Sequence, residues 1–280
     1  GHGHLLEWKQ EDEMPEGVLR VALGQVRGGD HVGEDVEKIA SFLRQGRELG
    51  VDVVLFPEGA VGGYFSVNFH DPADLDGDAV EQGLLEIQRV ARETGVAAAV
   101  GASRRAPDGR LTNSLLLISG QGEVLAEYVK TQLTASDRKC YAPGGSFPVV
   151  NFEGVPLGLL ICYDQRFPEP WRVLALRGAQ VVLHCSNACV PGDDWKIPVV
   201  EAHLRSRAAE NGFFVVSVNH AGPSQNWGSV IYDPQGLEVA RAGYDREELV
   251  PADLDLTRVN TTFLQERRTD LAAIYSASDL

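Results

Sequence analysis

The stretch Val155–Glu169, which reads VPLGLLICYDQRFPE, decides the fold. It opens with an apolar run that ends at Cys162, and this run has the length and the bounding residues of a buried strand. Pro168 suits the first position of a helix, so we predict a helix after a short polar segment. A cysteine between a buried strand and a helix lies at the carboxyl edge of a sheet, where open α/β sheets bind ligands. Backbone N–H groups there can lower a thiol pKa and hold an oxyanion, although most free cysteines are small buried hydrophobic residues.

Apolar runs of strand length alternate with amphipathic segments of helix length along most of the chain. The other predicted strands are Val18–Val26, Val51–Phe56, Val96–Ala102, Asn113–Ile118, Glu123–Val129, Ala179–His184, Phe213–Val218, Gly228–Tyr232, Leu237–Arg241 and Val250–Leu256. The predicted helices are Asp30–Gly50, Asp78–Thr94, the segment from Pro168 to Gly178, and Pro198–Asn211. Strand–helix–strand units predict parallel crossovers, and together with hairpins they indicate an α/β protein built in layers.

No linker, repeat or change of composition divides the sequence. We therefore predict a single domain over residues 18–280, preceded by a flexible polar arm at residues 1–17. The first four residues, Gly-His-Gly-His, are interpreted as an expression remnant because no initiator Met precedes them. Apolar residues spaced through the C-terminal tail are candidates for docking on another subunit: Phe263, Leu271, Ile274 and Tyr275.

The composition restricts the classes of partner. The chain has 280 residues, a formal net charge of -15, and a hydrophobic fraction of 44%, which is ordinary for a globular protein. The negative charge argues against nucleic-acid and anionic-membrane partners. No apolar run approaches the roughly 20 residues that cross a bilayer, and no signal peptide is visible. The cysteines are interpreted as thiols in a reducing cytoplasm, and no second pair accompanies Cys185 and Cys189, so we predict no metal site.

Three chemically useful side chains stand at the ends of predicted strands: Glu58, Lys130 and Cys162. Taken singly, each has an ordinary structural explanation. Taken together, they supply the roles that acyl transfer needs, because a thiol can attack, a carboxylate can move its proton, and an ammonium can stabilise the oxyanion. The backbone N–H of Tyr163 is the natural second oxyanion donor.

These residues carry a resemblance to a known family. The motifs FPE at 56–58, YVKT at 128–131, CYDQRFPE at 162–169, RAAEN at 207–211 and DPQG at 233–236 are similar to those of the nitrilase, or carbon–nitrogen hydrolase, superfamily. The resemblance runs from Val21 to about Arg268. It implies a four-layer α-β-β-α sandwich, homodimers or larger assemblies joined across outer helices, and no metal or organic cofactor. It also implies that Glu58 is the general base and acid, Lys130 the oxyanion stabiliser and Cys162 the nucleophile.

Similar enzymes often carry a second glutamate after the lysine. Asp137 stands at the matching position here. It is expected to orient Lys130 or the substrate amide, and the alternative is a surface pair with Arg138 or Lys139, which contributes little.

The residues after the cysteine favour the amidase branches. Tyr163-Asp164 stands where nitrilases usually have Trp-Glu, and the run is similar to omega-amidases, Nit-type proteins and N-carbamoyl amino-acid amidohydrolases. Arg166 is expected to capture a substrate carboxylate, and the alternative is a structural ion pair with Glu169 or Asp164. Asn187 matches an asparagine of the carbamoylases. Tyr64 and Trp195 are candidates for apolar pocket walls, or else ordinary core residues.

The sequence therefore predicts a cytoplasmic, cysteine-dependent hydrolase that cleaves a small amide, either an omega-amide or an N-carbamoyl compound, through a thioester and releases ammonia. Four alternatives stay open at this point. The four are a nitrilase acting on a nitrile, a catalytically weak relative that binds a partner, an acyltransferase, and an enzyme with a papain-like Cys162–His184 pair.

Overall fold

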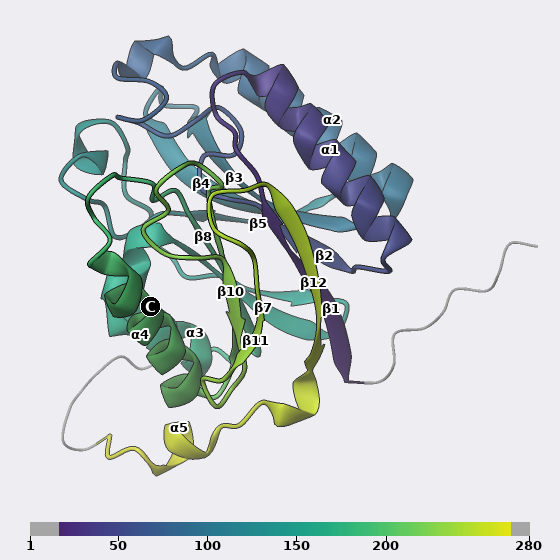
Figure 1. Cartoon of the computed structure of the whole chain (residues 1–280), viewed down its shortest axis with the longest axis vertical. Helices are drawn as coiled ribbons and strands as arrows, with labels where there is room; N and C mark the ends of the chain where they lie inside the picture. The colour runs from purple at the N-terminus through teal and green to yellow at the C-terminus, as the bar shows by residue number, and fades with distance from the viewer. Residues whose placement is uncertain (1–16, 270–280) are drawn as a thin grey trace, which may run out of the picture.

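The structure is a computed structural model, and it describes residues 17–269. Two six-stranded sheets form its centre (Figure 1). The first sheet has, in spatial order, β12 (Glu248–Asp255), β1 (Val18–Gln25), β2 (Val53–Leu55), β3 (Ala97–Arg105), β4 (Leu111–Ile118) and β5 (Val124–Val129). The second has β11 (Glu238–Arg241), β10 (Val230–Tyr232), β9 (Phe214–Asn219), β8 (Val181–Ser186), β7 (Val155–Ile161) and β6 (Val149–Phe152).

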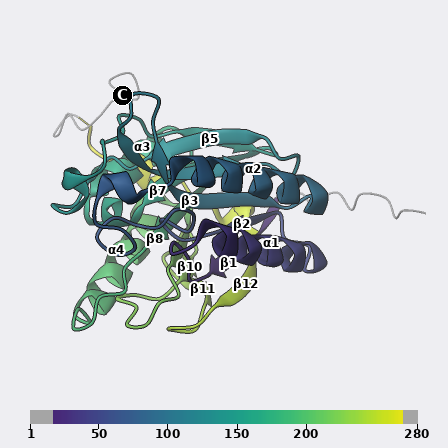
Figure 2. The same cartoon turned by 90° about the horizontal axis from the view of Figure 1, so that it is seen from above.

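Helices cover the outer face of each sheet. The two long helices α1 (Val32–Glu48) and α2 (Gly77–Thr94) lie side by side against the first sheet, and α3 (Pro168–Leu176) and α4 (Lys196–Asn211) pack on the second (Figures 1 and 2). The short α5 (Thr262–Glu266) contacts α4. The sheets face each other through contacts of β1 with β9, β2 with β8, and β4 with β7. The predicted four-layer α-β-β-α sandwich is confirmed.

The apolar run of β2 is continuous because both faces of this strand are buried. Val53 and Leu55 belong to the core between the two sheets, whereas Val54 and Phe56 belong to the core beneath α1 and α2. The strand pairs in parallel with both β1 and β3, as the strand–helix–strand pattern predicts. β7 and β8 are parallel as well. The carboxyl ends of β2 and β8, which belong to different sheets, meet where the N–H of Glu58 donates to the carbonyl oxygen of Ser186 at 3.4 Å.

The prediction misses one strand and ends another too early. The strand β6 is missing from the prediction, since a strand of four residues is too short to show a period. It joins β7 through a turn in which Glu153 and Gly154 have φ of 49° and 88°. The strand β8 continues to Ser186, because its ladder with β9 runs on to Asn219, so His184 lies inside the strand rather than at its end.

Some predictions lie outside the described residues. These are the arm at residues 1–16 with its first four residues, and the three apolar tail residues beyond residue 269. Phe263, the one member of the tail group that is described, is 63% exposed on α5. Among residues 17–269, no helix has both the length and the apolar character that crossing a membrane requires.

Candidate active site

The carboxylate of Glu58 is buried just beyond the carboxyl end of β2 and accepts three hydrogen bonds. Its Oε1 accepts from Lys130 Nζ at 2.8 Å and from Asn113 Nδ2 at 2.7 Å. Its Oε2 accepts from the backbone N–H of Asn187 at 2.9 Å. The neighbouring strand approaches closely at Gly101, where a Cβ atom would lie 2.2 Å from the carbonyl oxygen of Pro57. Only glycine permits this approach, so β3 sets the height of Glu58.

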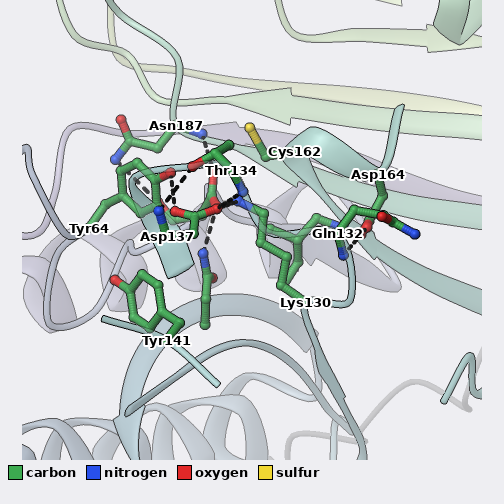
Figure 3. A network of polar contacts seen from close by, with 12 residues as sticks. Tyr64, Lys130, Gln132, Thr134, Asp137, Tyr141, Cys162, Asp164 and Asn187 are labelled. Atoms are coloured by element: carbon green, nitrogen blue, oxygen red, sulfur yellow. Dashed lines mark hydrogen bonds and ion pairs between the residues drawn. The ribbon is translucent and has the colours of Figure 1, made fainter. Parts of the chain in front are cut away.

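Lys130 joins Glu58 to Asp137. It follows β5, and its Nζ lies 2.8 Å from Asp137 Oδ2 as well as 2.8 Å from Glu58 Oε1, with all three side chains fully buried (Figure 3). Asp137 also accepts hydrogen bonds from Tyr64 Oη at 2.6 Å and from the backbone N–H of Thr134 at 3.1 Å. The alternative of a surface pair between Asp137 and a neighbouring cation is therefore wrong. The aspartate side chain is one methylene shorter than the glutamate of similar enzymes, but it still reaches Lys130 Nζ.

The three charges determine the protonation of the group. Burial disfavours the ammonium of Lys130, but the attraction of Glu58 and the other surrounding anions outweighs it and raises the pKa of Lys130 well above its usual value. Burial also opposes the charge of Asp137, yet the Lys130 ammonium and the hydrogen bonds it receives lower the pKa of Asp137 below its usual value. Lys130 and Asp137 are therefore both charged at neutral pH.

Cys162 stands immediately after β7 in a strained backbone conformation. Its φ is 42°, in the left-handed region that non-glycine residues seldom adopt and that often marks functional positions. The residue is 9% exposed, beside Lys130 and Asp137 (Figure 3). Burial is the main cause that raises the pKa of the Cys162 thiol, and the Glu58 carboxylate raises it further. The resting site therefore holds a thiol beside a carboxylate, so attack by the sulfur requires removal of its proton.

A cavity of about 520 Å³ opens in front of Cys162. Tyr64, Tyr163, Arg166 and Asn187 line it, as does part of the chain beyond β8. The structure thus places four of the predicted substrate-binding and oxyanion residues around one cavity.

Trp195 does not line this cavity, so its predicted role as an apolar wall is wrong. It is 58% exposed just before α4. Its ring lies 5.6 Å from the guanidinium carbon of Arg166, a cation–π contact. Arg166 also contacts His203 Nε2 at 3.4 Å.

The alternative ion pair of Arg166 with Asp164 is not formed, since Asp164 is buried and engaged elsewhere. Asp164 accepts from Tyr128 Oη and from the backbone N–H of Ile161, each at 2.8 Å, and from Gln132 N–H at 3.2 Å. Burial raises the pKa of Asp164 to about 6. This carboxyl group ties the segment that carries Lys130 to the strand that carries Cys162.

Sequence reasoning did not identify Asn113 or Asp164 as parts of the site. Asn113 lies within β4, in the polar stretch Thr112-Asn113-Ser114 that precedes an apolar run, so its neighbours do not single it out, and it donates to Glu58. Asp164 stands inside the motif after the cysteine, but the sequence offers it only as a partner of Arg166. The thiol of Cys162 is not paired with the imidazole of His184, whose Nε2 lies 3.1 Å from the carbonyl oxygen of Cys162 instead.

The arrangement matches a known enzyme family. A family model described as carbon-nitrogen hydrolase matches residues 20–262. This chain belongs to the carbon–nitrogen hydrolase family. Among relatives of the hydrolase, an (R)-stereoselective amidase from Pseudomonas sp. is 35% identical over 79% of this chain and 81% of that protein. A 2-oxoglutaramate amidase from Bacillus subtilis is 31% identical, with 80% of this chain and 85% of that protein covered.

A solved structure supports the same assignment. The hydrolase is similar to an amidase from Nesterenkonia sp., with a TM-score of 0.79, 28% identity, and coverage of 92% of this chain and 96% of the other. A mutant of the amidase from Nesterenkonia sp. AN1 has also been solved with the acetamide moiety of fluoroacetamide covalently added at its active-site cysteine. The prediction of an amidase-type member of the nitrilase superfamily is confirmed.

Proposed function

We propose that this hydrolase cleaves small linear amides that carry a carboxylate, forming a thioester on Cys162 and releasing ammonia. The observation that carries the proposal is the buried group in which Lys130 lies 2.8 Å from both Glu58 and Asp137, next to a thiol that opens onto a cavity. The cysteine adduct in a mutant of the similar amidase supports a nucleophilic cysteine at this position of the family.

The first half of the reaction forms the thioester. The sulfur of Cys162 attacks the amide carbon while Glu58 accepts the thiol proton, which is needed because burial keeps the sulfur protonated at rest. The ammonium of Lys130 and the backbone N–H of Tyr163 stabilise the oxyanion. When the carbon–nitrogen bond breaks, Glu58 returns the proton to the leaving nitrogen, which departs as ammonia.

The second half releases the acid. Glu58 takes a proton from a water molecule as the water oxygen attacks the thioester carbon. The Lys130 ammonium and the Tyr163 N–H stabilise the second oxyanion. The carbon–sulfur bond then breaks, and the proton returns to Cys162. In both halves Asp137 and Asn113 are assigned the task of holding Lys130 and Glu58 in place.

The carboxylate of the substrate is assigned to Arg166. This guanidinium lines the same cavity as Cys162, and within residues 17–269 no carboxylate forms an ion pair with it. Lys196, the other cation along the cavity, is already paired with Asp193. An arginine held over an aromatic ring can bind a carboxylate through two parallel hydrogen bonds. The similar 2-oxoglutaramate amidase supports a substrate of this class.

Two substrates of equal length test the proposal. Succinamate and butyramide differ only in that a carboxylate replaces a methyl group, and ammonia release gives kcat/KM for each. We expect the wild-type enzyme to favour succinamate, and Arg166→Ala to lower kcat/KM for succinamate about 10- to 100-fold, as expected for charge-assisted hydrogen bonds. Butyramide turnover should change less than about twofold.

Lys196→Met is the matched control, since it removes a cation of the same cavity that is already neutralised. It should leave the preference for succinamate intact. An equal fall in kcat/KM for both substrates in Arg166→Ala would contradict the assignment. A higher kcat/KM of the wild-type enzyme for butyramide than for succinamate would contradict it as well. Homodimers and a cytoplasmic location, implied by the resemblance and the cysteine content, stay predictions, and light scattering of the purified protein tests the first.

A further inference from the structure

His184 contacts the backbone of the nucleophile rather than its sulfur. It lies in β8 next to β7, and its Nε2 is 3.1 Å from the carbonyl oxygen of Cys162. Its Nδ1 is 2.9 Å from Ser217 Oγ on β9. Both side chains are completely buried, and neither lines the cavity. The proposed reaction assigns no task to either residue.

The contacts fix the tautomer of the imidazole. A carbonyl oxygen only accepts hydrogen bonds, so Nε2 must carry the proton. Burial lowers the pKa of His184 to about 4, so the ring is neutral near pH 7. In the neutral ring Nδ1 is then an acceptor, and Ser217 donates its hydroxyl proton to it. The carbonyl therefore selects the tautomer, and the hydroxyl of Ser217 satisfies Nδ1 and holds the ring in the orientation that donates to Cys162.

Holding that carbonyl also sets the direction of an N–H group. The C=O of Cys162 and the N–H of Tyr163 belong to one peptide unit, and in a trans peptide the two groups point in opposite directions. A donor fixed on the carbonyl side therefore prevents the N–H on the other side from rotating away. Tyr163 lines the cavity, and the φ of 42° at Cys162 shows that the turn needs external support.

We propose that His184, oriented by Ser217, is a positioning residue that aims the Tyr163 N–H at the oxyanion. The inference rests on the proposed function, which makes this N–H an oxyanion donor. The hydrogen bond to the carbonyl also polarises the shared peptide and strengthens its N–H as a donor. The imidazole acts through the peptide and touches neither the sulfur nor the substrate.

Two reactions of Cys162 separate this role from a general structural one. Acetylation by p-nitrophenyl acetate forms a carbon–sulfur bond, expels p-nitrophenolate and passes through an oxyanion. Alkylation by iodoacetamide forms a carbon–sulfur bond and expels iodide with no carbonyl oxyanion. Nitrophenolate release gives the acetylation rate, and the mass of the peptide containing Cys162 gives the alkylation rate. Cys162→Ala gives the background for both reactions. Neither reaction requires knowledge of the physiological amide.

Three variants form the series. His184→Leu removes the donor at similar volume, His184→Gln keeps an N–H near the position of Nε2, and Ser217→Ala removes the hydrogen bond that orients the ring. We expect His184→Leu to lower acetylation by about 10²-fold, the scale of losing one oxyanion donor, with alkylation changed less than about twofold. His184→Gln should restore most of the acetylation rate, and Ser217→Ala should lower acetylation while leaving alkylation unchanged.

The outcomes distinguish the two proposals. Unchanged acetylation in His184→Leu, or an equal fall in acetylation and alkylation, would overturn the positioning role. If His184→Leu does not fold, as judged by circular dichroism, the same comparison in Ser217→Ala decides in the same way. Acetylation of Cys162→Ala at the wild-type rate would overturn the proposed nucleophile, whatever the His184 variants do.

Discussion

Gly101 tests how closely the sheet must hold Glu58. A Cβ atom on this residue would lie 2.2 Å from the carbonyl oxygen of Pro57 and 2.7 Å from the Cα of Glu58, both backbone atoms that cannot rotate away. Since Cβ contacts below 3.0 Å are essentially never seen, Gly101→Ala must push the Pro57–Glu58 backbone away by about 0.8 Å. The carboxylate hydrogen bonds at 2.7–2.9 Å cannot all survive that shift. A displacement near 1 Å at a reacting group lowers turnover by about 100-fold.

The assay is ammonia release from a saturating amide, with circular dichroism to establish that the variant is folded. We expect kcat of Gly101→Ala to fall about 100-fold, together with a stability loss of about 1–3 kcal/mol from overpacking. The matched control is Gly33→Ala in α1, where a new Cβ atom meets nothing within 4 Å. It should keep the wild-type kcat. A folded Gly101→Ala variant with wild-type kcat would refute the view that this close approach positions Glu58.

Two further predictions concern buried carboxylates. Asp137→Asn leaves Lys130 without one of its two anions, so it should lower the free energy of unfolding by about 3 kcal/mol in urea denaturation and reduce turnover, whereas Asp108→Asn, on the exposed Asp108–Arg110 pair, should change neither. Equal stabilities of the two variants would contradict the buried pair. Asp35→Asn tests a pH dependence, because burial raises the pKa of Asp35 from 3.8 to about 6. The folded wild type keeps this proton up to a higher pH than the unfolded chain does, so the free energy of unfolding of the wild type falls as pH rises from about 4 to 6. The new amide does not titrate, so the free energy of unfolding of Asp35→Asn should rise relative to that of the wild type by up to about 3 kcal/mol across that window. A stability difference that stays constant with pH would exclude this titration.

The sequence predicts the layers of the fold well because burial leaves a direct pattern. The continuous apolar run of β2 indicates a strand covered on both faces, and the helical spacing in α1 and α2 indicates one buried face each. It misses β6, whose four residues carry no period and depend on pairing with β7. It also ends β8 too early, since the ladder with β9 rather than hydrophobicity extends that strand.

The site shows the same division. Glu58, Lys130 and Cys162 each follow an apolar strand, and this pattern, with the family resemblance, points to them before any coordinates. The burial of Asp137 is hidden by its charged sequence neighbours, and only the fold turns its side chain toward Lys130 and Tyr64. The exposure of Trp195 is not predictable from the sequence either, because a tryptophan near a predicted pocket favours a buried position.

The central claim is that Cys162 carries the acyl group of the amide during turnover. The most direct measurement is mass spectrometry of peptides from enzyme quenched in acid during steady-state hydrolysis of succinamate, compared with Cys162→Ala. We predict a succinyl thioester on the peptide containing Cys162, which disappears when the substrate is exhausted and is absent from the variant. Steady-state turnover with no acyl group on that peptide, or undiminished ammonia release by Cys162→Ala, would contradict the account.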